Sequence, residues 1–165
     1  MSRLSALLMI GAVAAAAFGQ QPNTPSATMT IDGIDGPSYP MNGTGSGQPV
    51  FTSTISQLLV SGFGGAPFLV AFSANGNLQN FSAPIFGDKL DLPFSPPVGI
   101  WLNGYFGSGA GFYNTGPTGA LSLGIPVPST MTINSTRAFQ GAITDPSSPA
   151  GFSLTAATRI LVTQG

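Results

Sequence analysis

The sequence predicts an all-β protein built from many short antiparallel strands. Beyond residue 27, no stretch of the chain repeats apolar residues at helical spacing. Instead, short runs rich in Val, Ile, Leu, Thr and Phe end at Gly, Pro, Asn or Asp about every ten residues. The chain has 23 Gly and 15 Pro, which supply the turns between such runs.

Ten segments qualify as strands, and strands so closely spaced without helices are typical of a sandwich or a barrel. We expect a β-sandwich of jelly-roll or immunoglobulin-like type with roughly eight to ten strands. The segments are 27–32, 49–54, 57–62, 67–72, 89–92, 98–102, 119–123, 130–134, 138–144 and 152–163.

The last segment, 152–163, shows the clearest alternation of side chains. Phe152, Leu154, Ile160 and Val162 share one parity, while Ser153, Thr155, Arg159 and Thr163 share the other. Successive side chains of a strand point to opposite faces of its sheet. The first set is therefore expected to pack inward and the second to meet water.

Turn residues and Gly-rich stretches separate the segments. Asp32-Gly33, Asp35-Gly36, Asn42-Gly43 and Asn75-Gly76 all tolerate positive φ and suit tight turns. Residues 41–48 and 107–119 are expected to form long exposed loops. The composition does not change along the mature chain, so residues 20–165 are predicted to form a single domain.

The first 19 residues have the pattern of a cleaved secretory signal peptide. Arg3 precedes an apolar run over 4–18, and Ala17 and Gly19 are small residues at the positions that a signal peptidase reads. The run of about 15 residues is shorter than the ~20 that a membrane-spanning helix needs. We therefore expect a secreted protein, located outside the cell, at its surface or in the periplasm.

The composition excludes several functions. Charged residues are only 5% of the chain, and His and Cys are absent. Too few Lys and Arg remain to bind nucleic acid, and zinc would lack its usual thiolate and imidazole ligands. Neither a Ser-His-Asp nor a Cys-His relay can form. We therefore predict a protein that is not an enzyme and carries no cofactor, with calcium as the alternative.

Two short segments carry paired carboxylates. Asp32 and Asp35 lie in one, and Asp88 and Asp91 in the other. Such pairs can serve as turn residues, calcium ligands or an acid-base pair. Asp before Gly favours the turn. Asp32 and Asp35 nevertheless remain the candidate calcium ligands, whereas no catalytic residue is predicted.

Trp101, Tyr105 and Tyr113 are the candidate ligand-binding residues, since the only Trp and two of the three Tyr fall within a short stretch. Such side chains combine an apolar ring with a polar edge. Alternation places Trp101 opposite Val98, Ile100 and Leu102. If those three line the core, Trp101 faces outward; the alternative is that a second layer or a loop covers it.

The C-terminal segments resemble a module common in secreted proteins of planctomycetes and myxobacteria. The module runs from an Ile-Pro segment through a Gln and an Asp-Pro turn to a closing Arg-Ile-x-Val strand. The resemblance implies a β-rich secreted domain without assigned activity. We also expect Arg159 to pair with Asp145 across the turn. The matching positions are Ile125, Pro126, Gln140, Asp145, Pro146, Pro149, Gly151, Ser153, Leu154, Thr155, Arg159, Ile160 and Val162.

The export signal, the shortage of catalytic residue types and the low charge together favour a non-enzymatic structural, adhesive or assembly module. Its place would be the bacterial cell envelope or the extracellular matrix, and its partner an extracellular protein, a polysaccharide or a second copy. The alternatives are a carbohydrate-binding module that uses the exposed aromatics and, less favoured, a small outer-membrane β-barrel. Prolines and short strands oppose the barrel.

Overall fold

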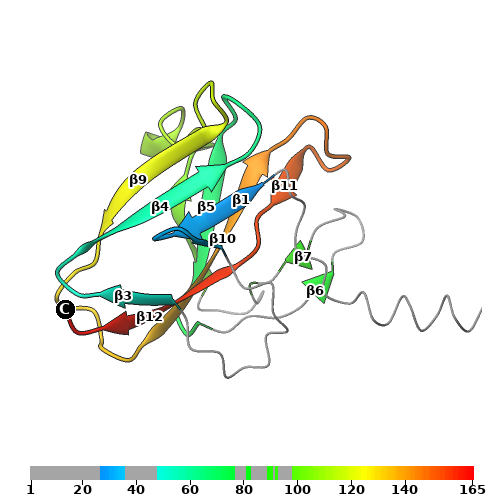
Figure 1. Cartoon of the computed structure of the whole chain (residues 1–165). Coiled ribbons are helices and arrows are strands. Elements are labelled where there is room, and N and C mark those ends of the chain that lie inside the picture. Colours follow the sequence, from blue (N-terminus) through cyan, green and yellow to red (C-terminus); the bar gives the residue numbers. More distant parts are fainter. Residues whose placement is uncertain (1–26, 36–47, 77–80, 83–88, 91, 93–97) are drawn as a thin grey trace, which may run out of the picture.

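The computed structural model describes residues 27–35, 48–76, 81–82, 89–90, 92 and 98–165 (Figure 1). The predicted signal peptide lies outside these residues. So do five predicted turn or carboxylate residues: Gly36, Asn42, Gly43, Asp88 and Asp91. Within them the chain contains strands, turns and one short 3-10 turn, η1 (Gly107–Gly109), and no α-helix.

Two sheets carry the fold. The first is antiparallel throughout, with the strand order β2 (Ile34–Asp35), β1 (Thr28–Ile31), β4 (Ile55–Ser61) and β9 (Ala120–Pro126). The second has the order β3 (Gln48–Phe51), β12 (Thr158–Thr163), β10 (Thr136–Thr144), β5 (Phe68–Ser73) and β8 (Val98–Asn103), with β11 (Phe152–Leu154) also paired to β10. Its pairings are antiparallel except for β3 with β12.

The two sheets face each other across one apolar core. β9, β4 and β1 lie in front of β5 and β10 in Figure 1. A separate pair, β6 (Phe81–Ser82) with β7 (Lys89–Leu90), forms the small third sheet. The core joins alternate residues of both sheets, among them Met29, Leu58, Val60, Phe68, Val70, Ile143 and Val162. The predicted all-β, mostly antiparallel, sandwich-like fold is therefore confirmed.

The first hairpin shows how turn chemistry sets the register. Ile31 pairs with Ile34, so Asp32 and Gly33 alone form the loop between β1 and β2. Both have positive φ, 53° for Asp32 and 78° for Gly33. A two-residue hairpin of this kind needs positive φ twice, which Asp-Gly tolerates. The turn predicted at Asp32-Gly33 is confirmed.

One predicted strand is wrong. Residues 130–134 form successive turns rather than a strand. Met131 N donates to Pro128 O at 3.1 Å, and Ser135 N donates to Thr132 O at 3.2 Å. These hydrogen bonds close locally, and Asn134 has a φ of 63°. The β-branched composition of this segment therefore does not decide its conformation.

The predicted strand 152–163 is interrupted at 155–157, between β11 and β12. Ser153 and Thr155 are buried rather than exposed, contrary to the alternation. Thr155 Oγ1 accepts a hydrogen bond of 2.9 Å from Gly141 N, and Thr155 N donates to Gly141 O at 2.9 Å. These bonds to the β10 backbone hold Thr155 inside and break the alternation.

The expected Asp145–Arg159 pair is also wrong. Asp145 Oδ2 accepts a hydrogen bond of 2.8 Å from Ser153 Oγ, and its Oδ1 accepts from both the backbone and the hydroxyl of Ser147. Arg159 lies opposite Ala138, seven residues along β10 from the turn. That separation is about 23 Å at the usual rise per strand residue, so hydroxyls of the turn and of β11 bind the carboxylate instead.

Candidate functional site

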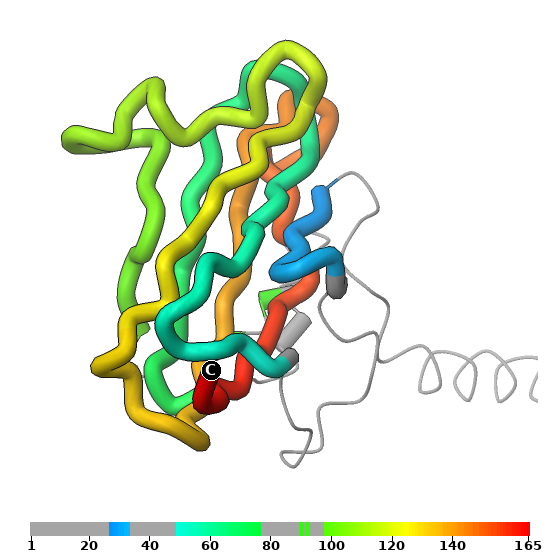
Figure 2. Tube along the Cα trace, turned by 60° about the vertical axis from the view of Figure 1, so that its left-hand side comes forward, coloured from blue at the N-terminus to red at the C-terminus, as the bar shows by residue number. Residues whose placement is uncertain are grey.

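The segment 105–113, which we call the aromatic loop, is held by a dense set of backbone hydrogen bonds. It follows β8 and projects from one end of the molecule in Figure 2. Asn103 Oδ1 accepts from Tyr105 N at 3.0 Å and from Phe106 N at 3.1 Å. At the other end, Asn114 Nδ2 donates to Gly111 O at 2.7 Å. Two Asn side chains thus close the loop at its two ends.

Two phenylalanines of the aromatic loop are the most exposed large apolar side chains in the described part of the chain. Phe106 is 75% exposed and Phe112 is 68% exposed. Each lies beside a tyrosine: the ring centroids of Phe106 and Tyr105 are 6.3 Å apart, and those of Phe112 and Tyr113 are 5.1 Å apart. The loop therefore presents two apolar rings from a hydrogen-bonded frame.

The two tyrosines anchor the loop to the body of the sandwich. Tyr105 Oη lies 2.9 Å from Thr144 Oγ1, at the end of β10. The Tyr113 ring packs 6.1 Å from that of Phe68, one of the fully buried core residues. Both tyrosines are half-buried, so they support the exposed phenylalanines beside them.

Unlike the two tyrosines, Trp101 does not belong to the aromatic loop, because its ring faces the inside of the sandwich. Val70 pairs with Leu102 and Ala71 with Ile100, which leaves Trp101 as the extra residue of a β-bulge. Trp101 and Leu102 consequently both contribute to the interior, whereas Val98 and Ile100 are 39% and 61% exposed. Val98 and Ile100 do not line the core, so Trp101 does not face outward. The structure matches the alternative, in which Trp101 is covered.

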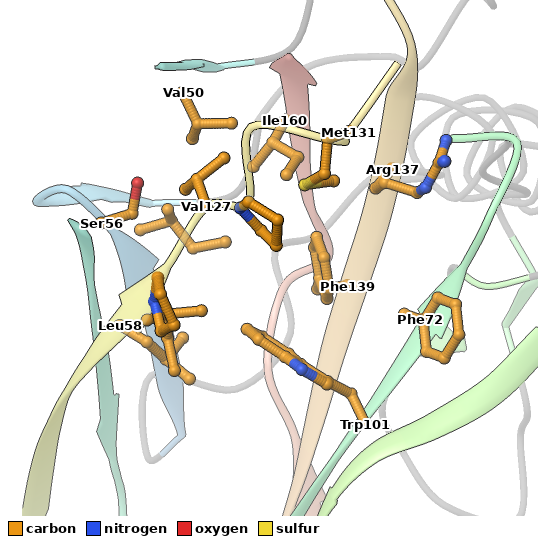
Figure 3. Close-up of a pocket in the computed structure, with 14 residues that line it drawn as sticks. Val50, Ser56, Leu58, Phe72, Trp101, Val127, Met131, Arg137, Phe139 and Ile160 are labelled. Atoms are coloured by element: carbon orange, nitrogen blue, oxygen red, sulfur yellow. The ribbon is translucent and has the colours of Figure 1, made fainter. Parts of the chain in front are cut away.

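The Trp101 ring borders a cavity of about 400 Å³ between the two sheets (Figure 3). Its centroid lies 4.9 Å from that of Phe139. Strands of both sheets and the connection after β9 supply the walls. The lining residues are Ile31, Val50, Ser56, Leu58, Phe72, Trp101, Ile125, Pro126, Val127, Pro128, Met131, Arg137, Phe139 and Ile160.

Only two of these lining side chains are polar, and they come from opposite sheets. Ser56 lies on β4 with the parity of Leu58 and is 6% exposed. Arg137 lies on β10 with the parity of Phe139, so it is on the inward face. Its Nη1 donates to Ala74 O at 2.6 Å and to Thr136 O at 2.8 Å. These two carbonyls fix one end of the guanidinium.

The candidate calcium ligands are only partly described. Asp32 Oδ1 accepts a hydrogen bond of 2.7 Å from Gln57 N, which joins the hairpin turn to β4. Asp35 belongs to β2, but its side chain is not described. Across the described ranges no group of three or more His, Cys, Asp or Glu is arranged to hold a metal ion. Asp32 acts here as a turn residue.

Sequence reasoning missed Phe106, Phe112 and the cavity. Phe112 lies inside the Gly-rich stretch 107–119 that was expected to be an exposed loop, and Phe106 directly precedes it, so their position was the available signal. Arg137 could have been placed inward by alternation from Phe139.

Neither a protein-family model nor a curated protein matches this chain. In the described part of the chain, no helix has the length and apolar character to cross a bilayer.

Proposed function

We propose that the protein is a secreted, non-enzymatic module that assembles or adheres in the bacterial cell envelope or extracellular matrix. The observation that carries this proposal is the aromatic loop, with Phe106 and Phe112 exposed on a hydrogen-bonded frame. Burial of two such rings in a contact removes a large apolar area from water. Because the loop is already ordered, little conformational entropy is lost on binding.

The charge of the protein supports assembly with other copies or with similar surfaces. Charged residues are 5% of the chain, and the formal net charge is -1. A low net charge opposes association only weakly. The lack of His and Cys supports the non-enzymatic part of the proposal, because the common nucleophile relays need one of them.

Secretion and domain organisation belong to the same proposal. Residues 1–19 would be removed on export, and residues 20–165 would form a single sandwich of jelly-roll or immunoglobulin-like type. N-terminal sequencing of the protein recovered from culture medium and from the cell surface tests the first point. A mature N-terminus at or near Gln20 supports it, and recovery of the intact chain inside the cell contradicts it.

Sedimentation velocity over a range of protein concentrations tests assembly through the aromatic loop. We expect the exported protein to form concentration-dependent larger species, and the double variant Phe106→Ser/Phe112→Ser to lose them. Phe51→Ser is the matched control, because Phe51 is an exposed phenylalanine of β3 outside the loop. A protein that stays monomeric at all concentrations and is found free in the medium contradicts the proposal.

Carbohydrate binding is the second candidate, and the grouping of four aromatic rings on the aromatic loop is the observation that favours it. Sugar rings stack on aromatic faces, and Tyr105 and Tyr113 are half-buried beside the exposed rings. Of the three predicted residues, Trp101 faces the cavity instead. A glycan array read with the wild type and the Phe106→Ser/Phe112→Ser variant tests this role, and flat responses across the array reject it.

A further inference from the structure

We propose that the cavity between the sheets binds one small aliphatic carboxylate, with its chain in the apolar interior and its anionic head at Arg137. This site is distinct from the aromatic loop and does not rest on the assembly role. The cavity volume of about 400 Å³ lies in the ordinary range of small-molecule sites. Twelve of its fourteen lining residues are apolar, so the part of the ligand inside the cavity should be a hydrocarbon chain.

A cavity with such walls favours an apolar occupant over water. The space is open to solvent on one side, and a hydrocarbon chain that enters it removes apolar wall surface from water. The chain also adds dispersion contacts with the walls. Trp101 and Phe139 from one sheet and Leu58 from the other offer the chain its contact surface (Figure 3).

Arg137 decides the charge of the head group. Its side chain leaves β10 beside Met131 in Figure 3, and its guanidinium lies at the periphery of the lining residues. Nη1 gives its two hydrogens to Ala74 O and Thr136 O. Of the five guanidinium donors, the three on Nε and Nη2 then remain, and that edge matches a carboxylate. Among the described residues no carboxylate bonds to Arg137.

Ser56 is the second polar residue that lines the cavity. Its side chain lines the cavity from the opposite sheet and is 6% exposed. Its hydroxyl forms no hydrogen bond within the described part of the chain, but it is not one of the fully buried side-chain atoms without a partner, so solvent reaches it. Ser56 therefore does not select the ligand, and the charge of the head group depends on Arg137.

The only tryptophan of the chain provides the assay, since Trp101 borders the cavity. We would titrate the purified protein with monomeric decanoate and with decanol, which has the same chain length and no charge. We expect a saturable change in Trp101 fluorescence with decanoate and binding of decanol at least about tenfold weaker, because a charge-assisted hydrogen bond is lost. Each methylene added from hexanoate upward should tighten binding about threefold to fourfold until the cavity is full.

Two variants test the binding of the head group and the binding of the chain separately. Arg137→Gln should weaken decanoate at least about tenfold and change decanol less than about twofold. Ser56→Leu, which fills the cavity, should weaken both ligands, whereas Ile100→Ser on the outer face of β8 should weaken neither. Absence of a saturable signal with decanoate overturns the proposal, and so does equal binding of decanoate and decanol. Because the wild type is titrated with both decanoate and decanol, these two results test the proposal even if a variant does not fold.

Discussion

Ser153 donates a hydrogen bond of 2.8 Å from its hydroxyl to Asp145 Oδ2, and so joins β11 to the turn that follows β10. Hydrogen bonds from Ser147 and Ser153 lower the pKa of this buried carboxyl below its usual 3.8, against the opposing effect of desolvation. The charged form of Asp145 is therefore the one that the folded protein stabilises.

Asp145→Asn should lower the free energy of unfolding by about 1–3 kcal/mol at neutral pH, because hydrogen bonds to a charged acceptor are lost. A lowered pKa in the folded state stabilises the protein above pH 3.8, and this contribution disappears as the pH falls through the folded-state pKa. Urea unfolding from pH 7 to pH 2 should show the acid-dependent loss in the wild type and a smaller one in the variant. Equal acid dependence in both would contradict the assignment.

The hydroxyl of Tyr105 should matter more for stability than that of Tyr113. Tyr105→Phe removes the 2.9 Å contact with Thr144 Oγ1 and should cost about 0.5–1.5 kcal/mol. Tyr113→Phe is the matched control, since its hydroxyl has no hydrogen bond within the described residues while its ring packs on Phe68. Thermal unfolding of the two variants measures the difference, and equal losses would argue against the anchor.

Gly104 should be the least replaceable glycine beside the aromatic loop. A Cβ at this position would overlap the carbonyl oxygen of Tyr113 and lie 2.7 Å from that of Phe68, so backbone would have to move. Gly104→Ala should therefore cost roughly 2–4 kcal/mol, in line with other strained core changes.

Gly111→Ala provides the comparison within the same loop. Gly111 has a φ of 75° and open space where a Cβ would lie, so only the backbone preference opposes Ala there. The cost should be about 1–2 kcal/mol. Chemical denaturation of both variants checks the order, and a Gly104→Ala protein as stable as Gly111→Ala would show that the loop packing is looser than described.

Alternation and turn residues were sufficient to predict most strands, because both are local properties of the sequence. The Asp32-Gly33 hairpin and strands such as β5 and β10 follow from them. Local patterns were insufficient where a distant partner decides. Thr155 is buried because it bonds to Gly141, and the end of the segment 130–134 is held by Asn134 N, which donates to Val162 O at 2.8 Å.

The candidate site depended still more on features that alternation cannot show. A β-bulge places two neighbouring residues on one face, and Gly99 was its only signal in 98–102, since a glycine inside a strand often marks a bulge. The exposure of Phe106 and Phe112 depends on how far their loop projects from the sandwich. The cavity depends on the packing of two sheets, to which residues from Ile31 to Ile160 contribute.

The bulge in β8 leads to a prediction that opposes simple alternation. Trp101→Ala should lower the free energy of unfolding by roughly 2–4 kcal/mol, because the indole packs against Phe139 and the core. Ile100→Ala, on the neighbouring residue, should change it by less than about 0.5 kcal/mol, because Ile100 faces solvent. Urea denaturation followed by circular dichroism compares both variants without relying on the tryptophan signal. The reverse order would mean that Trp101 faces outward and Ile100 inward, as an unbroken strand would place them.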